Sequence, residues 1–297
     1  MTNSSKKKIL IIGASGFIGQ ALYRRLKTNL SEKYDITGTY CNTRAAPALE
    51  RLDVTKYNEL EQFLLKLKPD FILLAAGNKN VLNCEKEFLR GYAVNTQPVE
   101  SIITIISRNQ LPSRVIYYST DYVFDGKRGH YKDDDLPQPV TNYGRTKYLA
   151  EQVLANSDID YKIIRTAAVI GRGGTFFDWL LNEMATEKTL AMYDNVYFSP
   201  TPLSFLTEMT CKLIENYEYV AKKILHIVGE QQLSRYQFAC MVQNILNTDI
   251  HIVREKNPDT SSFQFNLSLE SSDIINTWRE KQFEDYLRDE IQNAIFR

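Results

Sequence analysis

The sequence has few of the side chains that build metal centres or disulfide frameworks. It contains four cysteines (Cys41, Cys84, Cys211 and Cys240) and three histidines (His130, His226 and His251) in 297 residues, and no two cysteines form a C-x-x-C pair. Scattered thiols of this kind fit reduced cysteines better than a disulfide framework or a zinc site. We therefore expect free thiols and no bound metal.

The sequence also lacks net charge and long apolar runs. Lys plus Arg and Asp plus Glu both number 36, so no overall field would draw the chain to nucleic acid or to a membrane surface. The first apolar run, residues 9–12, is far too short to cross a bilayer, and no signal-peptide pattern precedes it. These absences predict a cytoplasmic protein without nucleic-acid or membrane partners.

What the chain does have is an alternation of short β-branched runs with helical patterns, which is typical of parallel βαβ units covered by helices on both faces. We predict an α/β fold, with a Rossmann-like doubly wound parallel sheet over residues 6–170, completed by about 203–229. Beyond residue 171 the regularity loosens, and residues 171–202 and 230–297 are expected to form a smaller C-terminal substrate-binding lobe. The expected strands are 8–12, 34–39, 71–75, 114–118, 161–165, 224–228 and 250–253, and the expected helices are 17–29, 57–66, 87–108 and 143–156.

Three glycines, Gly13, Gly16 and Gly19, follow the first apolar run and open an amphipathic helical pattern. Between a strand and a helix, such glycines permit a tight turn, close approach of a pyrophosphate, and close packing of the helix on the sheet. The spacing G-x-x-G-x-x-G differs from the G-x-G-x-x-G of classical dinucleotide dehydrogenases. It predicts a dinucleotide-binding loop of the short-chain reductase type.

The end of the second expected strand carries no acidic residue that could bind a free ribose 2′-hydroxyl. Arg44 follows this strand and can pair with a 2′-phosphate, which favours NADPH and leaves NADH possible; an ordinary surface arginine is the alternative. Asp53 could reach the adenine amine. Residues 73–78 end their strand with small side chains, which would let a cofactor approach the backbone closely.

Tyr143 and Lys147 are four residues apart at the start of an expected helix, so their side chains share one face. A neighbouring ammonium lowers the pKa of a tyrosine because it favours the phenolate. This pattern alone also fits an ordinary helix face. If the pair, the glycine loop and the strand end at Ser119–Thr120 meet at one sheet edge, however, they assemble a carbonyl reductase site. Thr120 would then donate to the substrate carbonyl, Tyr143 would deliver the proton, and Lys147 would tune Tyr143 and hold the nicotinamide ribose.

Two segments of the expected smaller lobe, residues 171–179 and 194–202, combine aromatic rings with Gly and Pro and show little core-like periodicity. We expect them to line the pocket for a nucleotide and a sugar, with Phe176 and Tyr197 as contacts. The C-terminal residues carry an apolar stripe, which we expect to pack on the lobe; a homodimer surface is the alternative. The stripe consists of Phe283, Tyr286, Leu287, Ile291 and Ile295.

The segments GASGFIG, LDVTKYNEL, LLAAGN, YAVN, STDYVFDG, YGRTKYLAE and SPTPL, in this order, resemble those of extended short-chain dehydrogenases/reductases and specifically of the dTDP-4-dehydrorhamnose reductase family. The resemblance implies NAD(P)H-dependent reduction of a 4-keto-6-deoxy sugar carried on a nucleoside diphosphate, with Thr120, Tyr143 and Lys147 as catalytic residues. It further implies cofactor contacts from Gly13, Ser15, Gly16, Phe17, Ile18, Gly19, Arg44, Asp53, Val54, Ala75, Ala76, Gly77, Asn95, Tyr143 and Lys147, and substrate contacts from Ser119, Tyr122, Phe124, Phe176, Tyr197 and Thr201.

Two departures from the resemblance limit what it implies. Tyr122 follows Thr120–Asp121 where related sugar-nucleotide dehydratases have Glu, so dehydration is disfavoured; Ala167–Ala168 replaces residues that are often aromatic, so the sugar stays open. A second hypothesis remains, because the same subfamily resembles the regulatory beta subunit of methionine adenosyltransferase, which binds a dinucleotide and a partner protein. A third, an epimerase, would need an acid/base pair that we do not find in the sequence.

Overall fold

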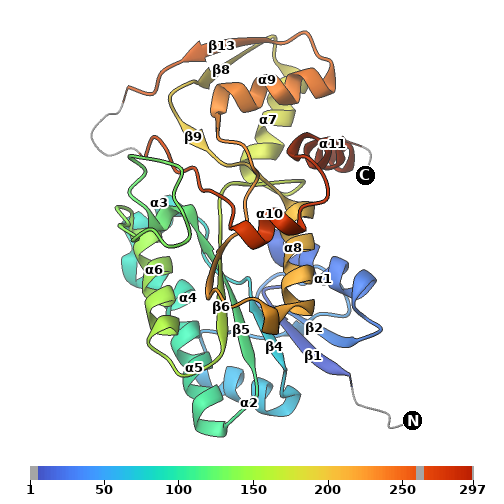
Figure 1. The fold of residues 1–297 in the computed structure, drawn as a ribbon, viewed down its shortest axis with the longest axis vertical. Coiled ribbons are helices and arrows are strands. Elements are labelled where there is room, and N and C mark those ends of the chain that lie inside the picture. Colours follow the sequence, from blue (N-terminus) through green and yellow to red (C-terminus); the bar gives the residue numbers. More distant parts are fainter. Residues whose placement is uncertain (1–5, 259–263, 296–297) are drawn as a thin grey trace. The chain divides into compact units, whose positions relative to one another are not determined.

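The structure, a computed structural model, describes residues 6–258 and 264–295 (Figure 1). The chain divides into two compact units, of which the first comprises Met1–Val123, Pro139–Ile164 and Leu213–Ile224. The second comprises Phe124–Gln138, Arg165–Lys212 and Leu225–Arg297. The domain boundaries given by the sequence stay a prediction.

The first unit contains most of a seven-stranded sheet in the order β11-β6-β5-β4-β1-β2-β3, of which the ends of β6 and β11 continue into the second unit. β1 pairs in parallel with β2 on one side and with β4 on the other, so the strand order reverses beside β1, as in other doubly wound folds. The predicted Rossmann-like sheet is therefore confirmed. The strands are β1 (Lys7–Ile12), β2 (Tyr34–Tyr40), β3 (Glu50–Arg51), β4 (Phe71–Leu74), β5 (Arg114–Thr120), β6 (Tyr161–Thr166) and β11 (Ile224–His226).

Helices cover this sheet and bury its strands on both faces (Figure 1). Leu10, Ile72 and Val115 pack with apolar side chains of α2, α5 and α6 in one core, and the alternate residues Ile9 and Ile11 are also fully buried. This two-sided burial explains why the strands are nearly continuous apolar runs in the sequence. The helices and the 3₁₀ turns of this part are α1 (Phe17–Asn29), α2 (Tyr57–Leu67), α3 (Val81–Lys86), α4 (Phe88–Asn95), α5 (Gln97–Asn109), η1 (Asp121–Val123), α6 (Asn142–Ala155) and η2 (Tyr217–Tyr219).

The single helix predicted over residues 87–108 is wrong, because the chain forms two helices there. α4 ends before Thr96, and α5 carries Pro98 in its first turn. Proline has no N–H to donate, which is tolerated in a first turn but not in a helix interior. The hydroxyl of Thr96 donates to the Thr146 carbonyl of α6 at 2.7 Å, so the break also anchors α6.

The second unit is more regular than the sequence suggested. Residues 175–186 form a helix whose Phe177, Leu180 and Met184 are buried, and Ser234 and Gln237 form a capping box at the start of another helix. The expectation of loosened regularity was therefore wrong for these segments. The elements are β7 (Val169–Ile170), α7 (Thr175–Thr186), β8 (Thr189–Tyr193), β9 (Tyr197–Phe198), β10 (Thr201–Pro202), α8 (Leu203–Glu215, which continues into the first unit), β12 (Leu233–Ser234), α9 (Arg235–Leu246), β13 (His251–Glu255), α10 (Asp273–Trp278) and α11 (Phe283–Ile295).

The second unit has its own apolar core. Phe283, Leu287 and Ile291 of α11 pack with residues of α7 and α9, and Tyr286 is also buried, whereas Ile295 is half-exposed. The C-terminal stripe is thus packed on its own unit, as expected. Within residues 6–258 and 264–295, no helix is long and apolar enough to span a membrane, and no group of three or more His, Cys, Asp or Glu side chains gathers as a metal site.

Candidate active site

Thr120, Tyr143 and Lys147 come together at the carboxyl end of β5. Tyr143 lies in the first turn of α6, whose N-cap residue Thr141 accepts a hydrogen bond from the backbone N–H of Gly144 at 3.0 Å. The side chains of Thr120 and Tyr143 lie within interaction distance of each other. One turn along α6, Lys147 donates from Nζ to the Tyr118 carbonyl of β5 at 2.6 Å.

The close approach of α6 to the strand end depends on a glycine. A Cβ on Gly144 would overlap the carbonyl oxygen of Tyr122 in η1, so only glycine lets the first turn of α6 lie against this segment. The ring of Tyr122 then packs edge-on against that of Tyr143, with centroids 5.5 Å apart. Local sequence therefore determines how closely the phenol lies to the strand end.

Burial shifts the pKa values of Lys147 and Tyr143 on α6 in opposite directions. It lowers the pKa of Lys147 to about 7, against an opposing effect of the nearby Glu151 carboxylate. It raises the pKa of Tyr143 above its ordinary value, an effect that the charge of Asp121 reinforces. The expected lowering of the Tyr143 pKa by Lys147 stays a prediction; burial, the largest effect on Tyr143, acts in the opposite direction.

The glycine loop has the geometry of a phosphate-binding turn. Gly13 has φ +88°, and a Cβ there would lie 2.7 Å from the Ala76 nitrogen; a Cβ on Gly19 would overlap the Gly13 carbonyl oxygen. Gly16, by contrast, is exposed, has extended backbone at the N-cap of α1, and would bring its Cβ no closer than 3.3 Å to a neighbour. The fold thus requires glycine at residues 13 and 19, whereas a Cβ at residue 16 would meet one tight contact, with the Gly13 carbonyl oxygen, and no other atom within 4 Å.

The loop after β4 lies beside this turn, and hydrogen bonds between Asn95 and Asn78 hold it in place. The buried Asn95 amide accepts from the Asn78 N–H at 2.7 Å and donates to the Thr146 hydroxyl of α6 at 3.0 Å. A Cβ on Gly77 would sit 3.0 Å from the Asn95 side-chain oxygen. Asn95, predicted as a cofactor contact, therefore also ties the Ala75–Gly77 segment to the catalytic helix.

The predicted ribose and adenine residues lie near the ends of β2 and β3. Arg44 is exposed, donates to the Pro47 carbonyl, and lies 6.0 Å from the centre of the Tyr40 ring. The Asp53 carboxylate accepts from the Thr55 hydroxyl at 2.7 Å, and this bond lowers the pKa of Asp53. The Arg44 guanidinium is accessible to a 2′-phosphate, and Asp53 is stabilised as an anion.

The chain matches the model of a known protein family over most of its length. Residues 7–270 match the model of a family described as "RmlD substrate binding domain". The chain belongs to this RmlD family.

Among its relatives, a dTDP-4-dehydrorhamnose reductase of Aggregatibacter actinomycetemcomitans is 28% identical, with 79% of this chain and 78% of that protein covered. Methionine adenosyltransferase 2 subunit beta of Xenopus laevis is 24% identical over 81% of this chain and 72% of that protein. The crystal structure of dTDP-4-dehydrorhamnose reductase from Bacillus anthracis, in complex with NADP, superposes with a TM-score of 0.83 at 23% identity and covers 96% of this chain and 99% of that one. The last similarity supports the fold of this RmlD-family chain.

The predicted substrate contacts of this RmlD-family member fall into two groups. In the first unit, Ser119 is buried at the end of β5, and its hydroxyl has no hydrogen-bond partner among the described residues. Such a polar atom gains from a ligand that can pair with it. It lies next to Thr120, with Tyr122 packed on Tyr143.

In the second unit, Phe124 and Thr201 are buried in the interior. Phe124 stacks on Tyr131 with centroids 4.3 Å apart, and Thr201 donates to the Ser199 carbonyl at 3.3 Å. Phe176 is part of an aromatic cluster, and the centre of its ring lies 4.3 Å from Cζ of Arg235. Tyr197 is partly buried in β9. Phe124 and Thr201 are thus buried among residues of their own unit, and their contact with substrate stays a prediction.

Sequence reasoning missed two buried carboxylates next to the catalytic side chains. Asp121 follows Thr120 and accepts its hydroxyl proton at 2.9 Å, and Glu151 lies one turn beyond Lys147 on α6. Both stand within the quoted segments STDYVFDG and YGRTKYLAE. The signal in the sequence was that each of these acidic residues stands in a segment expected to enter the core. Such a position points to a specific role, because buried carboxylates need specific partners.

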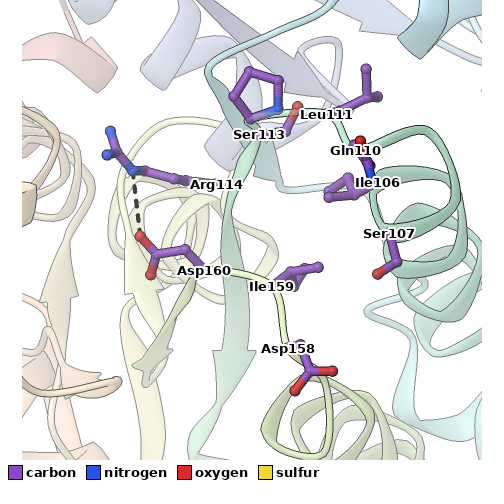
Figure 2. Close-up of a pocket in the computed structure, with 10 residues that line it drawn as sticks. Ile106, Ser107, Gln110, Leu111, Ser113, Arg114, Asp158, Ile159 and Asp160 are labelled. Carbon is purple, nitrogen blue, oxygen red and sulfur yellow. Dashed lines mark ion pairs between the residues drawn. The ribbon is translucent and has the colours of Figure 1, made fainter.

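A cavity in the first unit lies away from these residues (Figure 2). It is formed by the end of α5, the start of β5 and the loop before β6, and so lies at the amino ends of strands whose carboxyl ends carry the candidate site. Arg114 pairs there with Asp160 at 3.4 Å and packs between the rings of Phe71 and Tyr217. These contacts join the starts of neighbouring strands, and none of the predicted site residues lines the cavity.

Proposed function

We propose that this protein is an NADPH-dependent oxidoreductase that reduces the keto group of a nucleoside-diphosphate-linked 4-keto-6-deoxy sugar. One observation carries the proposal: Thr120 and Tyr143 lie next to each other at the end of β5, with Lys147 one turn along α6. The family membership and the reductase relative support the substrate class. NADH remains possible as a second reductant.

Each residue of the site has a defined task in this reaction. NADPH, when bound, supplies a hydride to the carbonyl carbon. Tyr143 gives its phenolic proton to the carbonyl oxygen, and its raised pKa keeps that proton in place at neutral pH until charge develops on the oxygen. Lys147, near half-protonated at pH about 7, holds the ribose and balances the phenolate that remains. Ser119, whose hydroxyl has no partner among the described residues, donates to the carbonyl, whereas the Thr120 hydroxyl proton is already given to Asp121.

The cofactor would lie along the carboxyl edge of the sheet. The amides that begin α1, at Phe17 and Ile18, follow the open surface above Gly16 and suit a pyrophosphate. Arg44 would bind the 2′-phosphate. Phe176 and Tyr197 stay predicted contacts of the sugar nucleotide.

The decisive test is NADPH oxidation by the purified chain with a panel of nucleotide-linked 4-keto sugars. We expect turnover with at least one of them, and we expect Tyr143→Phe to reduce it by about 10²–10⁴-fold because the proton donor is lost. NADPH affinity should be nearly unchanged in this variant. Tyr148→Phe, which removes another hydroxyl from α6, is the control and should keep its rate. Full activity of Tyr143→Phe would contradict the mechanism.

A second candidate function is regulatory binding of a dinucleotide without turnover, which the similarity to methionine adenosyltransferase 2 subunit beta favours. The same assay separates the two functions. Tight NADPH binding without oxidation against the whole panel would favour the regulatory function. Possible homodimer formation stays a prediction.

A further inference from the structure

A buried carboxylate, that of Asp121, lies next to Thr120 in the candidate active site. Asp121 is the first residue of η1 and is only 5% exposed. Its Oδ1 accepts the hydroxyl proton of Thr120 at 2.9 Å. The chain leaves β5 through Thr120, so the same turn that ends the strand brings this carboxylate next to the hydroxyl.

The bond to Asp121 determines which way the Thr120 hydroxyl points. A threonine hydroxyl has one proton to donate and can accept on the other side of its oxygen. Its proton is given to Asp121, and the oxygen also accepts from the Tyr122 N–H at 3.3 Å. A phenolate on Tyr143 would have to compete with the Asp121 carboxylate for this single proton.

We propose that Asp121 is a positioning residue for proton transfer: its hydrogen bond holds the Thr120 hydroxyl proton away from Tyr143, so that the Thr120 oxygen faces the phenol as an acceptor and not as a donor. In the catalytic step, the Tyr143 O–H bond breaks and a new O–H bond forms on the substrate oxygen, so Asp121 neither gains nor loses a proton. The catalytic consequence rests on the proposed function, but the protonation of Tyr143 can be measured without turnover.

Other groups also face Tyr143 and must be separated from Asp121. Tyr122 in η1, Cys84 in α3 and Tyr117 in β5 interact with it electrostatically, and Lys147 lies one turn along its own helix. Asp121 is the only residue among these that combines a carboxylate with a bond to the hydroxyl that contacts Tyr143. A substitution at this residue therefore changes both the charge and the hydrogen bond.

The test is a fluorine NMR titration of difluorotyrosine incorporated at position 143, whose phenol ionises at lower pH than that of tyrosine. In Asp121→Asn the titration midpoint should fall by about 1–3 pH units, since a negative charge that acts on Tyr143 is removed and a neutral amide oxygen competes less strongly than a carboxylate for the Thr120 proton. Asp134→Asn, which removes an exposed carboxylate from the segment between η1 and α6, should leave the midpoint unchanged.

The outcomes distinguish this inference from the proposed function. An unchanged midpoint in Asp121→Asn overturns the role of Asp121, whatever the activity. If Asp121→Asn fails to fold, Asp121→Ser, which lacks the charge and can still accept from Thr120, should show the same downward shift, and its absence there overturns the proposal equally. A shifted midpoint in a protein that oxidises no NADPH would support the positioning role and reject the reductase.

Discussion

Tyr143 and Lys147 show how burial sets the chemistry of single residues. Desolvation disfavours the charged form of each group, so it favours the neutral phenol and the neutral amine alike. The spacing of the two residues in the sequence was enough to predict that they share a helix face. Their pKa directions could not be predicted from it, because the burial of both side chains depends on residues such as Tyr117, whose ring lies 4.1 Å from Lys147 Nζ.

At the same scale, Arg44 should select the cofactor. We expect Arg44→Ala to weaken NADPH binding by about 1–2 kcal/mol and to leave NADH binding nearly unchanged, because only NADPH carries the 2′-phosphate. Isothermal titration with both cofactors measures the difference. Arg108→Ala, which removes an exposed arginine from the last turn of α5, should affect neither. Equal losses for both cofactors in Arg44→Ala would remove Arg44 from the selector role.

His226 should make the stability of the protein depend on pH. Burial, reinforced by the positive charge of Arg165, lowers the pKa of this histidine to about 3, and its Nδ1 lies 3.1 Å from the Tyr131 carbonyl. The unfolded chain binds a proton on His226 below pH about 6.5, whereas the folded chain does not until pH about 3. The contribution of His226 to the stability is therefore largest above pH about 6.5, and it is lost as the pH drops from about 6.5 towards about 3.

For this histidine, linkage predicts a loss of about 1.4 kcal/mol in the free energy of unfolding between pH about 7.5 and about 5.5. Urea denaturation at a series of pH values measures it. His226→Gln, although less stable overall, should lose this slope, and His251→Gln, at an exposed residue of β13, should keep it. A slope that persists in His226→Gln would assign the effect to other groups.

At the scale of elements, strands and their following turns were the most predictable part. β1, β4 and β5 lie within two residues of their predicted bounds because buried parallel strands are apolar throughout. The break at Thr96 was less evident, since the apolar pattern of α4 continues into α5 and only Pro98 marks it. α7 was missed because its aromatic residues resembled a binding loop, whereas Phe177 lies in the core.

The turn from β1 to α1 allows a matched test of fold against function. Gly19→Ala should lower the free energy of unfolding by about 1–3 kcal/mol, because its Cβ would overlap the Gly13 carbonyl oxygen. Gly16→Ala should keep the stability and weaken NADPH binding, since its methyl group would occupy the open surface proposed for the pyrophosphate. Thermal unfolding and cofactor titration of both variants check this. Unweakened NADPH binding in Gly16→Ala would argue against a phosphate site there.

At the scale of the whole molecule, each compact unit has an apolar core among its described residues. One core lies between the parallel sheet and helices α2, α5 and α6, and the other lies among α7, α9 and α11. The glycine loop and the catalytic side chains belong to the first unit. The sequence could predict that the C-terminal stripe is buried, because its apolar residues follow a helical period, but which neighbours it meets depends on segments about 100 residues earlier in the chain.

The presence of a core in each unit predicts that damage to the core of the second unit spares cofactor binding. Leu287→Ala in α11 should lower the free energy of unfolding by about 2–5 kcal/mol, because it leaves a cavity at a fully buried residue. Ile295→Ala, on the same helix but 52% exposed, should cost less than about 0.5 kcal/mol. Urea denaturation gives both values, and NADPH titration without denaturant should return the parent affinity for each variant, since the residues proposed to hold the cofactor keep their own core. A large loss of NADPH affinity in folded Leu287→Ala would show that the two cores are coupled.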